Sequence, residues 1–267
     1  MATVQTWVES RGVKLAAEVI GEGSPVTVLA HGLTGSRTDL AIFAPFLPGT
    51  KVLFDFRGHG DSERPGPGHY SMDDFAADVD AVAEAFGATG LAGISLGGGA
   101  ALRLLTRVPD RFERLVFLLP ARLERSMTAH TQLLHLADLL ERYPVEEVAD
   151  ILLAEEEAAG PFEEFPAARE LRREVILRMN REAMPHAIRE LLDDPPLRDD
   201  ASAVAGVRAP CLVIGQRGDP VHAAGVAEEL AAALPAAELV LFDDPNALLR
   251  DIPGVVQRMA AFLDGYR

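Results

Sequence analysis

The sequence predicts an α/β fold in which a mostly parallel sheet carries helices on both faces. Three observations support this prediction: short apolar runs alternate with helical patterns, two N-terminal segments alternate polar and apolar residues, and about eighty residues lack any strand-like run. Alternation of strands with helices is typical of parallel sheets, because each crossover places a helix between consecutive strands.

The elements can be assigned in chain order. Segments 5–9 and 15–20 alternate and predict an antiparallel pair near a sheet edge. Strands buried on both faces are predicted at 26–30, 52–56, 91–94, 115–119, 211–214 and 239–242. Helices are predicted at 72–86, 98–107, 223–234 and 253–263.

The interval 121–200 interrupts this alternation. Leucine and isoleucine recur there at helical spacing and prolines divide the segments, which predicts a helical insertion in a core formed by 1–120 and 201–267. Nineteen acidic and ten basic residues give the insertion −9 of the total charge of −16. Acidic runs such as 155–157 predict a solvated face and an acidic entrance, which favours a neutral or cationic substrate.

Composition narrows the function classes. The 267 residues carry 25 Lys and Arg against 41 Asp and Glu, which disfavours nucleic acid or an anionic membrane as a partner. The sequence has no apolar stretch of membrane-spanning length and no signal-peptide pattern, so a cytoplasmic protein with a small-molecule substrate is expected. The single cysteine, Cys211, is predicted to lie in the core. Neither a nucleotide-binding loop nor a metal-binding histidine pair is present, so no cofactor and no metal are expected; the oligomeric state stays open.

A nucleophile turn is predicted at 93–97, where Gly-Ile-Ser-Leu-Gly follows a buried strand and precedes a helix rich in glycine and alanine. The serine of this motif, Ser95, sits in a tight turn where flanking side chains would clash, and glycine removes the clash. The helix N-terminus then directs backbone N–H groups at the site.

The loop that follows strand 26–30 predicts an oxyanion site. Acyl transfer needs two donors near the developing negative charge, and the backbone amides of Leu33 and Leu96 are the natural suppliers. Gly32 lets this loop approach the serine closely, and His31 is expected to brace the loop rather than carry a proton.

Together with the turn Asp-Phe-Arg-Gly-His-Gly-Asp-Ser at 55–62, these motifs resemble the α/β-hydrolase fold superfamily, in the branch with a helical cap after the sixth strand. The resemblance covers essentially the whole chain. It implies an eight-stranded sheet, a cap at 121–200, and a structural role for His59.

The resemblance also implies an acid after the next-to-last strand, and Asp219 matches it. The family's histidine follows the last strand, about seven residues before a proline. Counting back from Pro253 puts Asn246 at that position, and no histidine follows His222. An amide cannot accept the serine proton, so the sequence predicts an incomplete triad.

Other histidines could supply the base. His222, three residues after Asp219, belongs to a loop expected at the rim of the site and is the first candidate, although a purely structural role is also open. His130, His135 and His186 lie in the cap, where His186 and Arg189 would share a helix face and could meet an acidic substrate group. His69 lies in a Pro/Gly loop and is expected to be solvated.

Two hypotheses follow. The first is a serine hydrolase of a small ester, lactone or related acyl compound, with Ser95 as nucleophile, Asp219 as acid and His222 as substitute base. The second is a non-hydrolytic member of the fold, either a small-molecule binder or a catalyst of the lyase or isomerase kind, because Asn246 stands where the histidine is usual.

Overall fold

The computed structural model describes residues 3–124, 130–158, 166–198 and 201–265. These residues form an eight-stranded sheet of order β1-β2-β4-β3-β5-β6-β7-β8. β1 pairs antiparallel with β2 and β2 with β4, whereas all other neighbours are parallel. The strands are β1 (Thr3–Ser10), β2 (Val13–Ile20), β3 (Val26–Ala30), β4 (Thr50–Phe54), β5 (Gly90–Ile94), β6 (Arg114–Leu118), β7 (Cys211–Gln216) and β8 (Ala237–Phe242).

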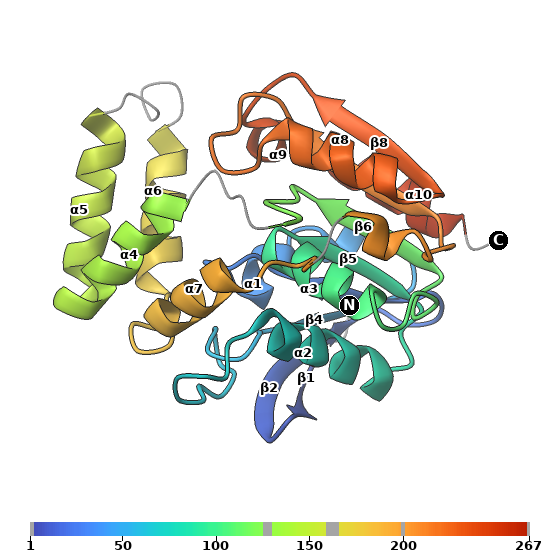
Figure 1. Ribbon diagram of the computed structural model, residues 1–267, viewed down its shortest axis with the longest axis horizontal. Coiled ribbons are helices and arrows are strands. Elements are labelled where there is room, and N and C mark those ends of the chain that lie inside the picture. Colours follow the sequence, from blue (N-terminus) through green and yellow to red (C-terminus); the bar gives the residue numbers. More distant parts are fainter. Residues whose placement is uncertain (1–2, 125–129, 159–165, 199–200, 266–267) are drawn as a thin grey trace.

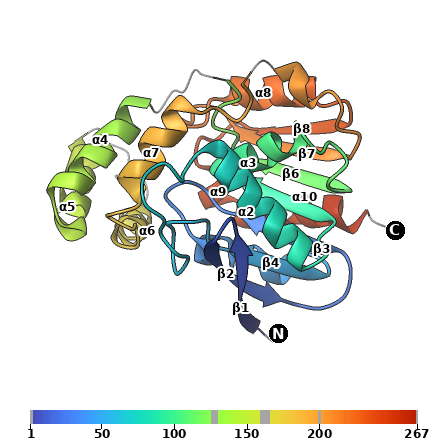
Figure 2. The ribbon, with the colours of Figure 1, turned by 60° about the horizontal axis from the view of Figure 1, so that its bottom comes forward.

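Helices cover both faces of this sheet (Figures 1 and 2). The core helices are α1 (Arg37–Leu40), α2 (Met72–Ala85), α3 (Leu96–Leu105), α8 (Ala224–Ala233), α9 (Ala247–Arg250) and α10 (Ile252–Asp264), with short 3-10 turns at η1 (Ala44–Phe46) and η2 (Ala201–Val204). Val28 and Val213 pack with α2, α3 and α8 on one face, whereas Leu29 and Leu212 pack with α10 on the other. Because successive strand residues point to opposite faces, both faces need apolar side chains, which explains the continuous apolar runs.

The structure confirms the predicted fold class and shifts some boundaries. The N-terminal antiparallel pair lies at the sheet edge, as predicted. β4 ends at Phe54 rather than at 56, because Phe56 leaves the sheet and its backbone N–H donates to the His31 ring. The prediction that 239–242 is buried on both faces is wrong: β8 is the other edge strand, and Leu239 is 37% exposed.

Within the described residues, four α-helices lie between β6 and β7, in the interval where the sequence predicts a cap (Figure 1). They are α4 (His130–Arg142), α5 (Val145–Ala158), α6 (Pro166–Leu177) and α7 (Met184–Asp193). Leu140 of α4, Val148 of α5 and Ile188 of α7 are fully buried in a hydrophobic cluster separate from the two that flank the sheet. Leu33 of the core packs against this cluster, so the helices meet the sheet domain at the loop after β3. No described helix is long and apolar enough to cross a membrane.

A buried arginine fastens the chain where it returns from these helices to the sheet. Arg103 of α3 donates through Nη1 to Asp73 at 2.8 Å, through Nη2 to Asp194 at 2.9 Å and through Nε to the Pro196 carbonyl at 2.8 Å. Its side chain is only 3% exposed. Asp194 also accepts the backbone N–H of Met72, so this cluster holds α2, α3 and the returning segment together.

We expect Arg103→Ala to lower the free energy of unfolding by about 3 kcal/mol, because the change removes a buried cation that joins two partly buried carboxylates to a backbone carbonyl. Arg198→Ala is the matched control: Arg198 contacts the same two aspartates but is 57% exposed, so the expected loss is below about 1 kcal/mol. Urea unfolding monitored by circular dichroism measures both. Equal losses would contradict the role assigned to burial.

Candidate active site

Ser95 occupies a strained turn between β5 and α3. Its φ is 50° and its ψ −108°, a backbone conformation that costs a non-glycine residue about 1–3 kcal/mol. A Cβ on Gly93 would lie 2.6 Å from the carbonyl carbon of Gly97, and a Cβ on Gly97 would lie 2.6 Å from the carbonyl carbon of Ala30. Both glycines of the motif are therefore required, because neighbouring backbone passes too close for any side chain.

The loop after β3 runs directly beside this turn. The Gly97 N–H donates to the His31 carbonyl at 3.1 Å, and a Cβ placed on Gly32 would be 3.6 Å from the Cβ of Ser95. Within the described part of the chain, the backbone amides of Leu33 and Leu96 donate no hydrogen bond. Gly32, Leu33 and Leu96, the three residues that the sequence assigns to an oxyanion site, all line one cavity with Ser95.

Two buried histidines hold this loop in place. The His31 ring donates from Nδ1 to the Gly32 carbonyl at 2.7 Å and accepts the Phe56 N–H at Nε2 at 3.0 Å, so the neutral ring satisfies both partners. Burial lowers the pKa of His31 well below its ordinary value. His59 lies with Nε2 2.6 Å from the Leu33 carbonyl and Nδ1 2.9 Å from the Arg57 carbonyl. The contacts of both histidines are those of structural braces.

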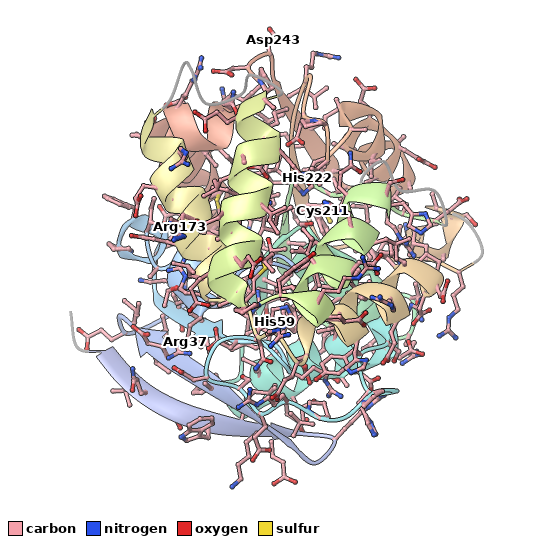
Figure 3. All side chains as sticks on the ribbon, turned by 90° about the vertical axis from the view of Figure 1, so that its left-hand side faces the viewer. Arg37, His59, Arg173, Cys211, His222 and Asp243 are labelled. Carbon is pink, nitrogen blue, oxygen red and sulfur yellow. The ribbon has the colours of Figure 1, made fainter. Side chains whose placement is uncertain are left out.

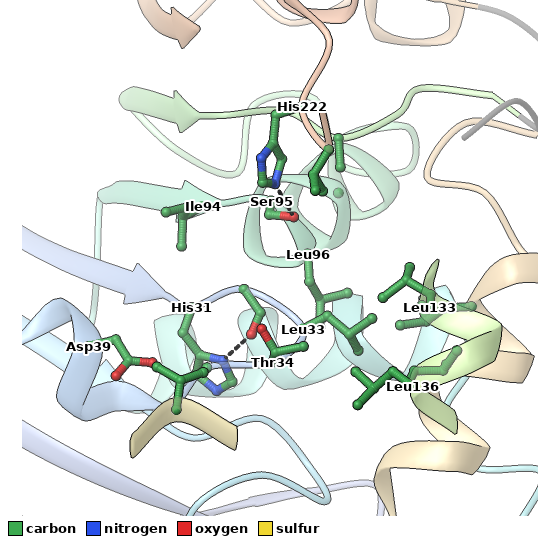
Figure 4. A pocket seen from close by; sticks show the side chains of 18 of the residues that line it. His31, Leu33, Thr34, Asp39, Ile94, Ser95, Leu96, Leu133, Leu136 and His222 are labelled. Atoms are coloured by element: carbon green, nitrogen blue, oxygen red, sulfur yellow. Dashed lines mark hydrogen bonds between the residues drawn. The ribbon is translucent and has the colours of Figure 1, made fainter. Parts of the chain in front are cut away.

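Ser95, His222 and Asp219 form one chain of hydrogen bonds. His222 Nε2 lies 3.2 Å from Ser95 Oγ, and His222 Nδ1 lies 3.1 Å from Asp219 Oδ2. Figure 4 shows the His222 ring directed at the Ser95 hydroxyl, with His31 and Leu33 on the opposite side of the serine. Since an ionised Asp219 can only accept, Nδ1 carries the proton and Nε2 presents its lone pair to the hydroxyl.

A tight turn after β7 places the acid and the imidazole together. Asp219 Oδ1 accepts the backbone N–H groups of Val221 at 2.7 Å and His222 at 2.9 Å, the pattern of an aspartate-initiated turn. Burial would raise the pKa of Asp219, but the hydrogen bonds and charge of His222, together with the Gln216 amide, lower it to about 2. Gln216 also accepts the backbone N–H of Leu248 at 3.3 Å, which ties the turn to the segment after β8.

Asn246 is the sequence-predicted site residue that the structure leaves outside the site. It is exposed, its backbone N–H donates to Asp244 Oδ1 at 2.9 Å, and it does not line the cavity. Asp243 of the same loop lies at the edge of the molecule in Figure 3, whereas His222 lies near the middle of that face. Asn246 therefore takes no part in this hydrogen-bond chain, and the imidazole within hydrogen-bond distance of Ser95 is that of His222, the substitute base that the sequence ranks first.

Among the described residues, no histidine other than His222 forms a hydrogen bond with Ser95. His135 lines the cavity but lies 3.0 Å from Glu155, and exposed His130 begins α4. The expectation that Arg189 meets a substrate together with His186 is wrong, since Arg189 pairs with Asp138 and Glu141 of α4. The described ranges hold no cluster of three or more His, Cys, Asp and Glu side chains that could bind a metal ion.

A cavity of about 900 Å³ separates the helices between β6 and β7 from the carboxyl edge of the sheet. Ser95 and His222 lie on its wall with Leu33 and Leu96, and Leu133 and Leu136 of α4 line it from the helical side (Figure 4). Leu152 of α5 also lines it. A cavity of this size that is mainly apolar, with few polar groups converging on one point, suits a small organic ligand.

Sequence reasoning missed two residues near the site, Gln216 and Arg122. Both lie beyond or at the carboxyl ends of central parallel strands, the edge where α/β folds bind their ligands. Arg122 follows β6 and lines the cavity, yet only 5% of its surface is exposed to solvent. The available signal was a lone arginine in the short segment that follows a buried strand.

Comparisons with known proteins establish the family. Residues 25–249 match the family described as alpha/beta hydrolase fold, and the chain belongs to it. RutD of Caulobacter segnis, named as a candidate carbamate hydrolase, is 39% identical over 102 residues, which cover 35% of this chain and 37% of RutD. Proline iminopeptidase PfmaB of Pestalotiopsis fici is 33% identical over 97 residues, 34% of each chain. The chain thus spans about a third of these curated relatives' length in each match.

Solved structures share the fold of this protein over nearly the whole chain. The enol-lactonase from Burkholderia xenovorans LB400 superposes with a TM-score of 0.80 and 23% identity, covering 97% of this chain and 100% of that one. This likeness concerns the fold, including the helices between β6 and β7.

The low pKa of Asp219 makes part of the stability acid-sensitive. A carboxyl whose folded pKa lies below its unfolded value stabilises the protein above the unfolded pKa and loses that contribution as pH falls. For a folded pKa of about 2, the contribution is about 2 kcal/mol, lost between about pH 5 and pH 2. We expect Asp219→Asn to remove this component from the pH dependence of the free energy of unfolding.

Urea unfolding at several pH values measures this effect. Asp243→Asn is the control, because the Asp243 side chain is 96% exposed, and its curve should follow that of the unmodified protein. An unchanged acid-induced loss in Asp219→Asn would contradict the prediction.

Proposed function

We propose that the protein is a serine hydrolase of a small ester, lactone or related acyl compound. The observation that carries the proposal is the 3.2 Å contact of His222 Nε2 with Ser95 Oγ, backed by Asp219 at 3.1 Å. Nucleophile, base and acid in this order, next to two unengaged backbone amides, are the parts that acyl transfer needs. The names of the curated relatives, a candidate carbamate hydrolase and an iminopeptidase, support acyl chemistry.

The reaction follows from the positions of these groups. Ser95 Oγ bonds to the acyl carbon as its proton passes to His222 Nε2, and the carbonyl electron pair moves onto oxygen. The amides of Leu33 and Leu96 are placed to stabilise that oxyanion, an effect worth about 10²–10³ in rate per donor. Collapse breaks the bond to the leaving group, which takes the proton from His222. Water then attacks the acyl-serine in the same way and releases the acid.

Asp219 has a positioning role in this scheme. Its carboxylate holds the proton of His222 on Nδ1 and stabilises the imidazolium that forms when the serine is deprotonated. Its low pKa keeps it ionised across the physiological range, so it does not compete for the transferred proton.

The non-hydrolytic alternative rests on the absence of a histidine at position 246. Because His222 lies within hydrogen-bond distance of Ser95, that absence no longer removes the base. The contact favours the hydrolase, and the exposed side chain of Asn246 has no part in the proposal.

The test combines covalent labelling with turnover of 4-nitrophenyl esters. A fluorophosphonate should label the protein once, at Ser95, and Ser95→Ala and His222→Gln should each lower kcat/KM by about 10³-fold or more. Asn246→Ala and Asn246→His are the matched controls, expected within about threefold of the unmodified protein because position 246 lies outside the cavity. Intact-protein and peptide mass spectrometry locate the label.

Three results would overturn this proposal. The first is the absence of labelling at every pH from about 6 to 9. The second is turnover that survives Ser95→Ala. The third is a large gain of activity in Asn246→His, which would place the base in the segment after β8.

A further inference from the structure

Arg122 is a buried cation on the wall of the cavity that contains Ser95. It stands four residues after the end of β6, the strand that pairs with β5, and β5 leads into the Ser95 turn. Only Nη1 of its guanidinium has a hydrogen-bond partner among the described residues, the Leu192 carbonyl at 3.2 Å. Nη2 is shielded from solvent and has none. A buried charged group in this state lowers stability unless something compensates it.

No carboxylate of the described residues pairs with Arg122. Arg37, Arg173 and Arg189 also have one buried nitrogen without a partner, but each has a carboxylate within 4 Å. Burial lowers the pKa of Arg122, and the charges of Asp194 and Asp193 only partly oppose this. Asp194 is already engaged by Arg103 and Arg198.

The Nε–Nη2 edge of the Arg122 guanidinium has no hydrogen-bond partner among the described residues, and this edge is of the kind that binds a carboxylate. Its unpartnered nitrogens, Nε and Nη2, are the pair through which Arg57 holds Asp78 in this same protein, at 2.9 and 2.7 Å. Two parallel N–H groups match the two oxygens of a carboxylate, which makes this edge both selective and strong.

The rest of the lining does not compete for an anion. Arg172 pairs with Glu156 at 3.1 Å, and Arg178 pairs with Asp39 at 2.8 Å. Glu155, the third acidic residue of the lining, faces His135. The lining therefore holds three arginines and three carboxylates, rather than the acidic excess expected from the composition of 121–200, and among these arginines Arg122 is the one without a carboxylate partner.

We propose that Arg122 binds a carboxylate of the substrate, so that the compound hydrolysed at Ser95 is an ester or lactone with a free carboxylate elsewhere in its acyl part. The type of reaction in this inference rests on the proposed function. The class of substrate rests on the Arg122 guanidinium, which has no carboxylate partner among the described residues. The apolar side chains that line the same cavity accommodate the hydrocarbon that joins the carboxylate to the scissile group. One guanidinium edge neutralises one negative charge, which suits a carboxylate better than a phosphate dianion.

The experiment compares two esters of equal shape, 4-nitrophenyl hydrogen glutarate, which carries the carboxylate, and 4-nitrophenyl 5-methylhexanoate, in which an isopropyl group replaces it. We expect the unmodified protein to prefer the glutarate ester in kcat/KM. Arg122→Met should lower the ratio of the two values about 100-fold, since a charge-assisted bidentate pair is lost. In Arg122→Lys the kcat/KM ratio should lie between those of Arg122→Met and the unmodified protein, because an ammonium keeps the charge but lacks the two parallel N–H groups of a guanidinium.

Arg172→Met is the matched control, since it removes a lining arginine that already has a carboxylate partner; the ratio should change less than about threefold. An unchanged ratio in Arg122→Met, or a preference of the unmodified protein for the neutral ester, would overturn the inference. Loss of folding stability in Arg122→Met with an unchanged ratio would mean that Arg122 only caps the end of α7 at Leu192.

Calorimetric titration with glutarate separates this inference from the proposed function. Glutarate that binds to the unmodified protein and not to Arg122→Met supports the carboxylate site even if neither ester is hydrolysed, in which case the proposed hydrolase function fails alone. Hydrolysis of both esters without glutarate binding or preference retains the hydrolase and rejects the role of Arg122.

Discussion

The left-handed backbone of Ser95 is the constraint on which the rest of the site depends. A φ of 50° at a serine persists only when its surroundings over-determine it. Here β5 is fixed between β3 and β6, and α3 begins at the next residue. Backbone packs against Gly93 and Gly97 from both sides of the turn. The same packing joins the turn to the loop at Leu33, so one set of contacts positions Ser95, Leu33 and Leu96 on the wall of one cavity.

The Asp219 carboxylate and the His222 imidazole belong to a single turn, so their relative position does not depend on the segment after β8. Asp219 accepts two backbone N–H groups of the turn as well as the His222 ring N–H, so the residues that form the turn also orient that ring. The proposed function therefore assigns no catalytic role to the segment after β8. That segment contributes Leu248 and Ile252 to the wall of the cavity instead, while Asn246 faces outward.

Charge in the helices between β6 and β7 acts locally rather than as a uniform field. Arg172 and Arg178 pair with two of the three carboxylates of the described cavity lining, Glu156 and Asp39. Exposed acidic residues such as Glu157 are screened by water and salt. Net charge therefore predicts poorly what a cavity attracts. A single buried guanidinium without a carboxylate partner counts for more there, because its Nη2 has lost its solvation and has no hydrogen-bond partner among the described residues.

The amino-acid sequence alone was enough to predict the features that depend on residues close together in the chain. Apolar runs marked the strands, and glycine at 93 and 97 marked the turn at Ser95, since each reflects local conformation or burial. Asp219 was located by the resemblance to the α/β-hydrolase fold, which implies an acid after the next-to-last strand. Only the tertiary structure decided which residues meet. Ser95 and His222 are 127 residues apart in the chain, and their contact depends on how β5 and β7 are spaced in the sheet. The outward position of Asn246, the exposure of β8 at the sheet edge and the unpaired state of Arg122 depend equally on packing between distant segments, which no local pattern records.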